Sequence, residues 1–311
     1  MSADDRERVK VSQRFEYKKT GVSTPGIIII YLFLLLVCLT MLFPFIHELA
    51  KSFSYPTEVD AGRVSVWPRE FTFGNYHFFF RYDLLREPLI RSFFNSIYIT
   101  IVGTVWSVFF TAMMAFPLSR PRKEFWISPI IMGVVIFSFV FRAPLVPYFL
   151  AIRAYGLMDS HWAIIIPHTI IPFHLILMLT FYRGLPEELF DSCRIDGGGD
   201  FRLFWQIALP LSKAALATIG IFTAVMLWNI FLHAVLFIRT AELNPLQVYV
   251  RGVMIAEVTV LAQDFAQHDP FAVSQSIKSS LILMTTVPII VVYPFLQRYF
   301  IKGALLGALK A

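Results

Sequence analysis

The segment LPEELFDSCRIDGGGDFRLFWQIALP, residues 185–210, lies between two strongly apolar stretches of the chain. It contains three consecutive glycines and most of the charged residues of its region. Because the apolar chain on either side belongs in lipid, we expect this segment to lie at the face of a membrane.

Two short helices are predicted within this segment. Residues 187–195 form the first, which the glycines at 197–199 end because glycine adopts turn conformations at little steric cost. Asp200 is predicted to cap the second helix and Pro210 to end it. One apolar stripe on that helix follows the spacing i, i+3, i+4, i+7 and i+8, in Phe201, Phe204, Trp205, Ala208 and Leu209. The pattern indicates a surface for docking a partner, although an ordinary amphipathic hairpin has the same spacing.

The composition indicates an integral membrane protein. The chain has 311 residues, of which 57% are hydrophobic and 15% charged, and phenylalanine alone contributes 32. Soluble domains carry roughly 25% charged residues. The net charge of +6 does not indicate nucleic-acid binding, because the basic residues flank apolar stretches instead of forming one patch. Two cysteines, Cys38 and Cys193, imply no disulfide framework, and no metal-ligand spacing is present.

Six apolar stretches predict six transmembrane helices in an all-α protein. They lie at about residues 26–46, 92–118, 126–152, 161–182, 214–238 and 278–300. Each is long enough to cross a hydrocarbon core of about 30 Å at about 1.5 Å per residue. The expected organisation is a tail at 1–25, a membrane domain at 26–300 that includes the loop 185–212, and a second tail at 301–311.

Charge predicts the orientation. With both termini in the cytoplasm, sixteen of the 27 basic residues lie in the inside segments, whereas the short external turn after the third stretch holds only Arg153. Positive residues favour the cytoplasmic side of a membrane. The segment 185–212 is therefore expected in the cytoplasm.

Polar residues within the apolar stretches are candidates for a substrate path. Arg142 lies inside the third stretch with Pro144 and Pro147 nearby, which predicts a broken helix. Broken helices often line a path, but Arg142 could instead snorkel to the interface. The Asn229 side chain can bond the hydroxyl groups of a solute or a neighbouring helix, whereas histidines beside prolines are more often structural.

Several motifs carry a family resemblance. The pattern Asp191-Ser192-Cys193, Asp196-Gly197, Ile207 and Leu209-Pro210 resembles the EAA loop of ABC-importer permeases, with an Asp in place of the usual Glu and Ser-Cys in place of two alanines. The resemblance implies a coupling helix that sits in a cleft of a cytoplasmic ATPase. The implied docking residues are Asp191, Ser192, Cys193, Asp196, Gly197, Phe201, Phe204, Trp205, Leu209 and Pro210.

Other stretches resemble the carbohydrate permeases of that family. They are Trp67-Pro68, residues 71–76, Phe94-Asn95-Ser96 and residues 156–160. Trp228-Asn229, residues 244–248 and Arg251 resemble a subgroup that includes permeases for uronate-containing oligosaccharides such as alginate or rhamnogalacturonan fragments. Candidate residues of the substrate pathway are Arg142, Asn229, His233 and Arg251.

The resemblance implies the permease subunit of a type I importer in the bacterial cytoplasmic membrane. Expected partners are a second permease subunit, two ATPase subunits, an extracytoplasmic binding protein and an oligosaccharide, with no nucleic acid. The chain lacks G-x-x-x-x-G-K-[ST], so we expect no cofactor on it, and ATP and Mg²⁺ to be used by the ATPase.

Two alternatives stay open at this point. One is an ABC permease for a non-sugar solute. The other is a secondary transporter driven by an ion gradient, which the absence of Asp and Glu from all six stretches disfavours. A membrane enzyme is disfavoured too, because no catalytic residue cluster has a plausible spacing.

Overall fold

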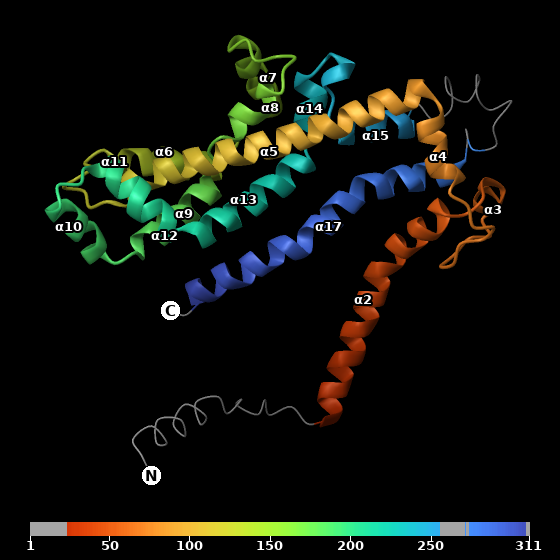
Figure 1. Cartoon of the computed structure of the whole chain (residues 1–311), viewed down its shortest axis with the longest axis horizontal. Coiled ribbons are helices and arrows are strands. Elements are labelled where there is room, and N and C mark those ends of the chain that lie inside the picture. Colours follow the sequence, from red (N-terminus) through yellow and green to blue (C-terminus); the bar gives the residue numbers. More distant parts are fainter. Residues whose placement is uncertain (1–23, 256–270, 272–273, 309–311) are drawn as a thin grey trace.

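The computed structural model describes residues 24–255, 271 and 274–308. In this part of the chain the regular secondary structure is entirely helical (Figure 1). The predicted N-terminal tail up to residue 23, the polar segment 256–270 and the last three residues lie outside the described residues.

Helices occupy every predicted membrane stretch. They are α2 (Thr24–Ser52), α5 (Asp83–Ser119), α6 (Ser128–Val140), α7 (Leu145–Ala154), α8 (Trp162–Ile165), η1 (Ile166–His168), α9 (Pro172–Arg183), α13 (Lys213–Trp228), α14 (Leu232–Phe237) and α17 (Gln275–Ala308). Shorter elements between them are α3 (Pro56–Asp60), α4 (Gly74–Arg81), η3 (Ala241–Leu243) and α15 (Leu246–Ile255).

Among the described residues, two helices are long and apolar enough to cross a membrane by themselves, at Pro25–Ser52 and Asp83–Ser119. Two bent pairs also pass that test, Trp162–His168 with Pro172–Arg183 at 44°, and Asp200–Leu211 with Lys213–Trp228 at 76°. Two to four spans follow from length and composition, so the number six stays a prediction.

The centre of the bundle is α5, which packs against α9 and α13 (Figure 1). Small and polar residues of α5 face its neighbours, among them Ser96, Ser107 and Thr111, all buried. Gly103 lets α13 approach closely, because a Cβ there would lie 2.5 Å from Cδ1 of Leu227. Small residues at contact positions are typical of helix packing in membranes.

Helix α2 diverges from the bundle and meets it only near its C-terminal end, against α17 (Figure 1). A buried polar cluster fixes that end. The Asn75 amide donates hydrogen bonds to the carbonyl oxygens of Ser52 and Ser54 at 2.8 and 2.9 Å. The Ser276 hydroxyl of α17 donates to the Asn75 side-chain oxygen at 2.7 Å. Asn75 on α4 therefore joins the end of α2 to the start of α17.

Three of the predicted stretches are interrupted. The third breaks at residues 141–144, as the prolines and Arg142 predict. The fourth breaks at 169–171, where Pro172 disfavours helical backbone in the residue before it. The fifth breaks at 229–231, directly after α13 ends at Trp228. The last two interruptions are corrections to the continuous helices that apolar length alone predicts.

Candidate functional site

The segment 185–212 forms two helical arms at one end of the bundle (Figure 1). The first is α10 (Glu187–Ile195), with the bounds that the sequence predicts. Gly197 has φ +77°, in the left-handed region that glycine adopts without strain. The second arm runs through α11 (Asp200–Arg202), the π-helical η2 (Leu203–Ala208) and α12 (Leu209–Leu211). The predicted pair of helices with a glycine turn is confirmed.

Two details of the second arm differ from the prediction. Gly199 occupies the cap position, and Asp200 is the first helical residue, without a side-chain cap hydrogen bond. Its carboxylate still lies in the first turn, where negative charge is favourable. Pro210 does not end the arm, because it lies in the first turn of α12, where no N–H donor is needed. The chain bends by 76° between Leu211 and Lys213 instead.

The predicted apolar stripe of the second arm is divided between core and surface. Phe204 and Ala208 are 5% and 0% exposed, whereas Phe201 and Trp205 are 77% and 42% exposed. The buried face also takes Leu203, which the α-helical spacing does not place there. The i→i+5 hydrogen bonds of a π-helix turn successive side chains by a smaller angle than an α-helix does. The single stripe is therefore wrong for residues 203–208.

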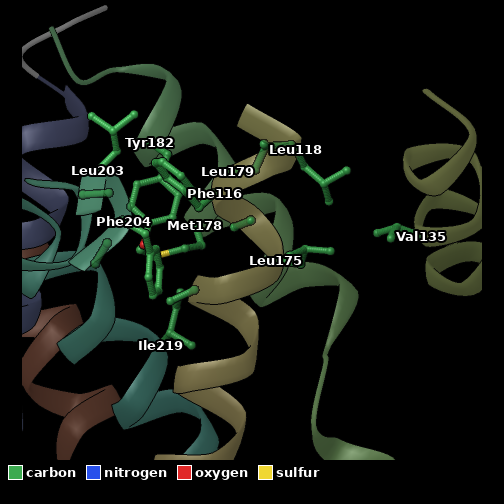
Figure 2. Packing of buried hydrophobic residues seen from close by; sticks show 14 of the residues in the cluster. Phe116, Leu118, Val135, Leu175, Met178, Leu179, Tyr182, Leu203, Phe204 and Ile219 are labelled. Carbon is green, nitrogen blue, oxygen red and sulfur yellow. The ribbon is translucent and has the colours of Figure 1, made fainter. Parts of the chain in front are cut away.

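Helix α10 is anchored to the bundle by one aromatic side chain. Phe190 is 1% exposed and is the only buried residue of this helix. Its ring lies 6.3 Å from that of Phe116 on α5. Phe116 in turn contacts Phe204 and Tyr182, in the core that Figure 2 shows. The anchor thus joins α10 to α5 and to the second arm.

Two arginines complete the attachment of α10. The Arg120 guanidinium lies 3.9 Å from the ring centroid of Phe190 and 5.0 Å from that of Phe116. Burial lowers the pKa of Arg120 from its ordinary value, which still leaves it charged at neutral pH. Arg194 donates a hydrogen bond to Glu124 in the turn after α5, and this bond raises the pKa of Arg194.

The outward face of α10 is polar with two exposed apolar side chains. Leu189 and Ile195 are 41% and 85% exposed, and the Ser192 hydroxyl donates to the Glu188 carbonyl at 2.7 Å. Leu189 and Ile195 are not among the docking residues that the sequence predicts, although apolar side chains on an otherwise polar helix could have indicated them. Of the ten predicted docking residues, Phe204 is buried, Cys193 and Leu209 are half-buried, and seven are exposed: Asp191, Ser192, Asp196, Gly197, Phe201, Trp205 and Pro210.

A second group of candidates lies at the helix breaks. Arg142 is exposed in the break of the third stretch and forms no ion pair or hydrogen bond with the described part of the chain. Asn229 is exposed in the fifth break, where its amide donates to the Val225 carbonyl at 2.8 Å. The Arg251 guanidinium lies 4.7 Å from the ring centroid of Phe231 in the same break.

His233 belongs to an aromatic cluster that the sequence does not predict. Its ring centroid lies 5.1 Å from that of His168, 5.2 Å from that of Tyr148 and 5.7 Å from that of Phe237. These residues come from α7, from η1, which packs against α8, and from α14; α7, α8 and α14 project from the same side of the bundle (Figure 1). The structure places Asn229 and Arg251 at the fifth break and His233 in the helix that follows it. No hydrogen bond, ion pair or ring contact joins any of these three described residues to Arg142.

Residues of the other motifs have structural partners. The Asn95 amide donates to the carbonyls of Glu242 and Asn244 at 2.8 and 3.1 Å and so joins α5 to the segment around η3. Asp159 accepts hydrogen bonds from the Thr240 hydroxyl and from the backbone N–H groups of Thr240 and Arg239. These bonds lower the pKa of Asp159. Both residues fasten the segment that follows α14.

No family model matches the chain. It is 38% identical over 267 residues to protein LplC of Bacillus subtilis, covering 86% of this chain and 88% of LplC. It is 36% identical over 284 residues to the polygalacturonan/rhamnogalacturonan transport system permease protein YtcP of the same bacterium, covering 91% and 97%. A chain in the crystal structure of a bacterial ABC transporter involved in the import of the acidic polysaccharide alginate matches with TM-score 0.79 and 27% identity, over 96% of this chain and 99% of that chain.

Proposed function

The chain belongs to the permease subunits of sugar ABC importers, and we propose that it forms half of the path by which an oligosaccharide crosses a bacterial cytoplasmic membrane. The observation that carries this function is the likeness to sugar permeases over nearly the whole of both chains. Function here resides in transport and not in catalysis by this chain. A separate ATPase is proposed to supply the energy.

We propose six membrane crossings with both termini in the cytoplasm. The crossings are α2, α5, the α6–α7 pair, the α8–α9 pair, the α13–α14 pair and α17. The concentration of basic residues on one side supports this arrangement. A half-pathway of six crossings requires a second, homologous permease subunit. The extracytoplasmic binding protein would then meet the face that carries α3, α4 and α15.

The ATPase is proposed to dock on α10 and the exposed part of the second arm. Supporting this, α10 presents an outward face with Asp191, Ser192 and the exposed apolar Leu189 and Ile195. A short helix with apolar side chains on a polar surface suits a groove of a partner protein. ATP and Mg²⁺ would bind to that partner, and this chain would hold neither.

We propose that the movement of the ATPase reaches the membrane helices through the contacts that attach α10 to the bundle. When the ATPase closes on ATP, α10 moves with it, and the Phe190 anchor passes the movement to α5 and the second arm. The breaks in the third, fourth and fifth stretches divide each of them into segments that can tilt separately. Alternating exposure of a central path to the two sides would follow.

The substrate is proposed to be an oligosaccharide that carries carboxylates. Polygalacturonan and alginate are acidic, and proteins that transport them resemble this chain. Arg142 supports the proposal, because it is exposed at a helix break and forms no ion pair with the described residues. A guanidinium binds a carboxylate through two parallel hydrogen bonds.

Uptake by the assembled complex in proteoliposomes tests both parts of the proposal. ATP-dependent uptake of an oligogalacturonate, with weaker uptake of a neutral oligosaccharide of equal length, is the expected result. Arg142→Gln should reduce uptake of the acidic sugar only. Uptake by the chain alone, driven by an ion gradient without ATP, would overturn the importer function. Equal uptake of acidic and neutral sugars would overturn the substrate class alone.

A further inference from the structure

We propose that Arg120 is a positioning residue that couples movement of the docking helix α10 to the membrane helix α5. This inference rests on the proposed function, because it assumes that an ATPase moves α10. Arg120 lies directly after α5, which ends at Ser119, and its side chain reaches α10. It acts through Phe190.

The attachment of α10 to the bundle depends on few contacts. Of its nine residues, only Phe190 is buried, and Cys193 is half-buried against the same core. Arg194 adds one ion pair, to Glu124. A helix of this length is not stable by itself in water. Apart from the backbone that connects it to α9 and α11, α10 is therefore attached to the bundle through these side chains.

Arg120 covers the one aromatic contact that joins α10 to α5. Its guanidinium lies 3.9 Å from the ring centroid of Phe190 and 5.0 Å from that of Phe116. The two rings lie 6.3 Å apart and come from different helices. A flat cation that contacts both rings holds them at a fixed separation, because it is attracted to the π-face of each.

Stacking, and not hydrogen bonding, holds the Arg120 side chain. Its Nε is buried and has no hydrogen-bond partner. Its only hydrogen bond to a described residue is a long one, 3.4 Å, from a terminal nitrogen to the hydroxyl of Ser119. Lysine could supply the charge here but not the planar group, so arginine and lysine should not be equivalent at this position.

The charges around Arg120 keep it in place without pairing with it. Glu124, Glu187 and Asp200 favour its charged form, whereas Arg194 disfavours it. The Glu124 carboxylate pairs with Arg194 and not with Arg120. Arg120 and Arg194 thus form two separate links from α10 to the end of α5, one aromatic and one ionic.

The variants Arg120→Lys and Arg120→Met test the inference in the assembled, reconstituted complex. Arg122→Met is the matched control, because Arg122 lies in the same turn and is exposed. Three quantities are measured for each: the amount of ATPase that co-purifies, ATP hydrolysis, and oligosaccharide uptake per ATP hydrolysed. The last ratio reports positioning, because a loss of folding or assembly would lower uptake and hydrolysis together.

We expect both Arg120 variants to retain the ATPase and to lower uptake per ATP by at least about fivefold, the change in an equilibrium that a cation–π contact of about 1 kcal/mol produces. Arg122→Met should leave the ratio unchanged. Provided that the wild-type complex transports, an Arg120→Lys complex with unchanged uptake per ATP would overturn this inference alone. So would a loss of uptake that is fully explained by a smaller amount of co-purified ATPase. A wild-type chain without an ATPase would overturn the proposed function and this inference with it.

Discussion

Removal of the Phe190 ring should release α10 from the bundle. Phe190 is 1% exposed and contacts Phe116 and Arg120, and it is the only buried residue of its helix. Truncating a buried phenylalanine to alanine costs about 3–5 kcal/mol. In most proteins such a loss lowers the free energy of unfolding of a whole domain. Here it should mainly lower the free energy needed to detach α10, because the nine residues of this helix have few other contacts with the bundle.

The expected consequence is local opening and not global unfolding. Hydrogen exchange of the amides in residues 189–195, measured on the protein in lipid nanodiscs, reports that opening directly. Phe190→Ala should speed this exchange by roughly a hundredfold to a few thousandfold, since about 1.4 kcal/mol corresponds to a factor of ten. Exchange in the middle of α5 should not change.

The neighbouring Leu189 supplies the control. It lies on the same helix and is 41% exposed. Leu189→Ala should speed the exchange of α10 far less than Phe190→Ala does, because Leu189 lies outside the core cluster that holds Phe190. If exchange in α10 is the same in Phe190→Ala as in the wild-type protein, α10 is held by something other than this anchor, and the reasoning on its attachment is wrong.

Three further results are expected. Asp159 has a lowered pKa because the Thr240 hydroxyl and the backbone N–H groups of Thr240 and Arg239 donate to it. Its stabilising effect is therefore present above its unfolded pKa of about 4 and is lost as pH falls through the folded pKa. Asp159→Asn should reduce the acid-induced fall in the thermal unfolding temperature. Gly197→Ala should destabilise the protein by roughly 1–2 kcal/mol in a thermal unfolding assay, because φ is +77° there. Gly199→Ala should have little effect in the same assay, because φ is −79° and no atom lies within 4 Å of the new Cβ. Asn95→Leu removes two hydrogen bonds to backbone carbonyls and should lower stability by about 1–3 kcal/mol; equal melting of variant and wild type would contradict that role.

Local patterns predicted the first arm of the segment 185–212 well. The polar helix at 187–195 and the glycine turn follow from propensity and backbone freedom, and both are short-range effects. The break near Arg142 followed equally from two prolines and a charge in an apolar stretch. Where one or two residues determine the backbone, the sequence is sufficient.

Effects that depend on tertiary packing were not predictable in this way. The π-helix at 203–208 places Leu203 in the core and leaves Trp205 partly exposed, which α-helical spacing cannot indicate. The break at 169–171 has a local signal in Pro172 that apolar length alone overlooks, whereas no proline or glycine marks the break at 229–231. The pairing of Arg120 with Phe190 joins residues 70 positions apart, and no periodicity brings them together.

The docking of an ATPase on α10 is the central claim, and a photo-crosslinking amino acid in place of Ser192 tests it most directly. Ser192 is exposed, and its hydroxyl bonds only to the backbone of its own helix, so the replacement disturbs no core contact. After irradiation of native membranes, the crosslinked protein is identified by mass spectrometry. We predict an ATP-binding subunit as the product. Crosslinks to lipid alone, or labelling of residue 192 by an impermeant reagent from outside the cell, would contradict the claim.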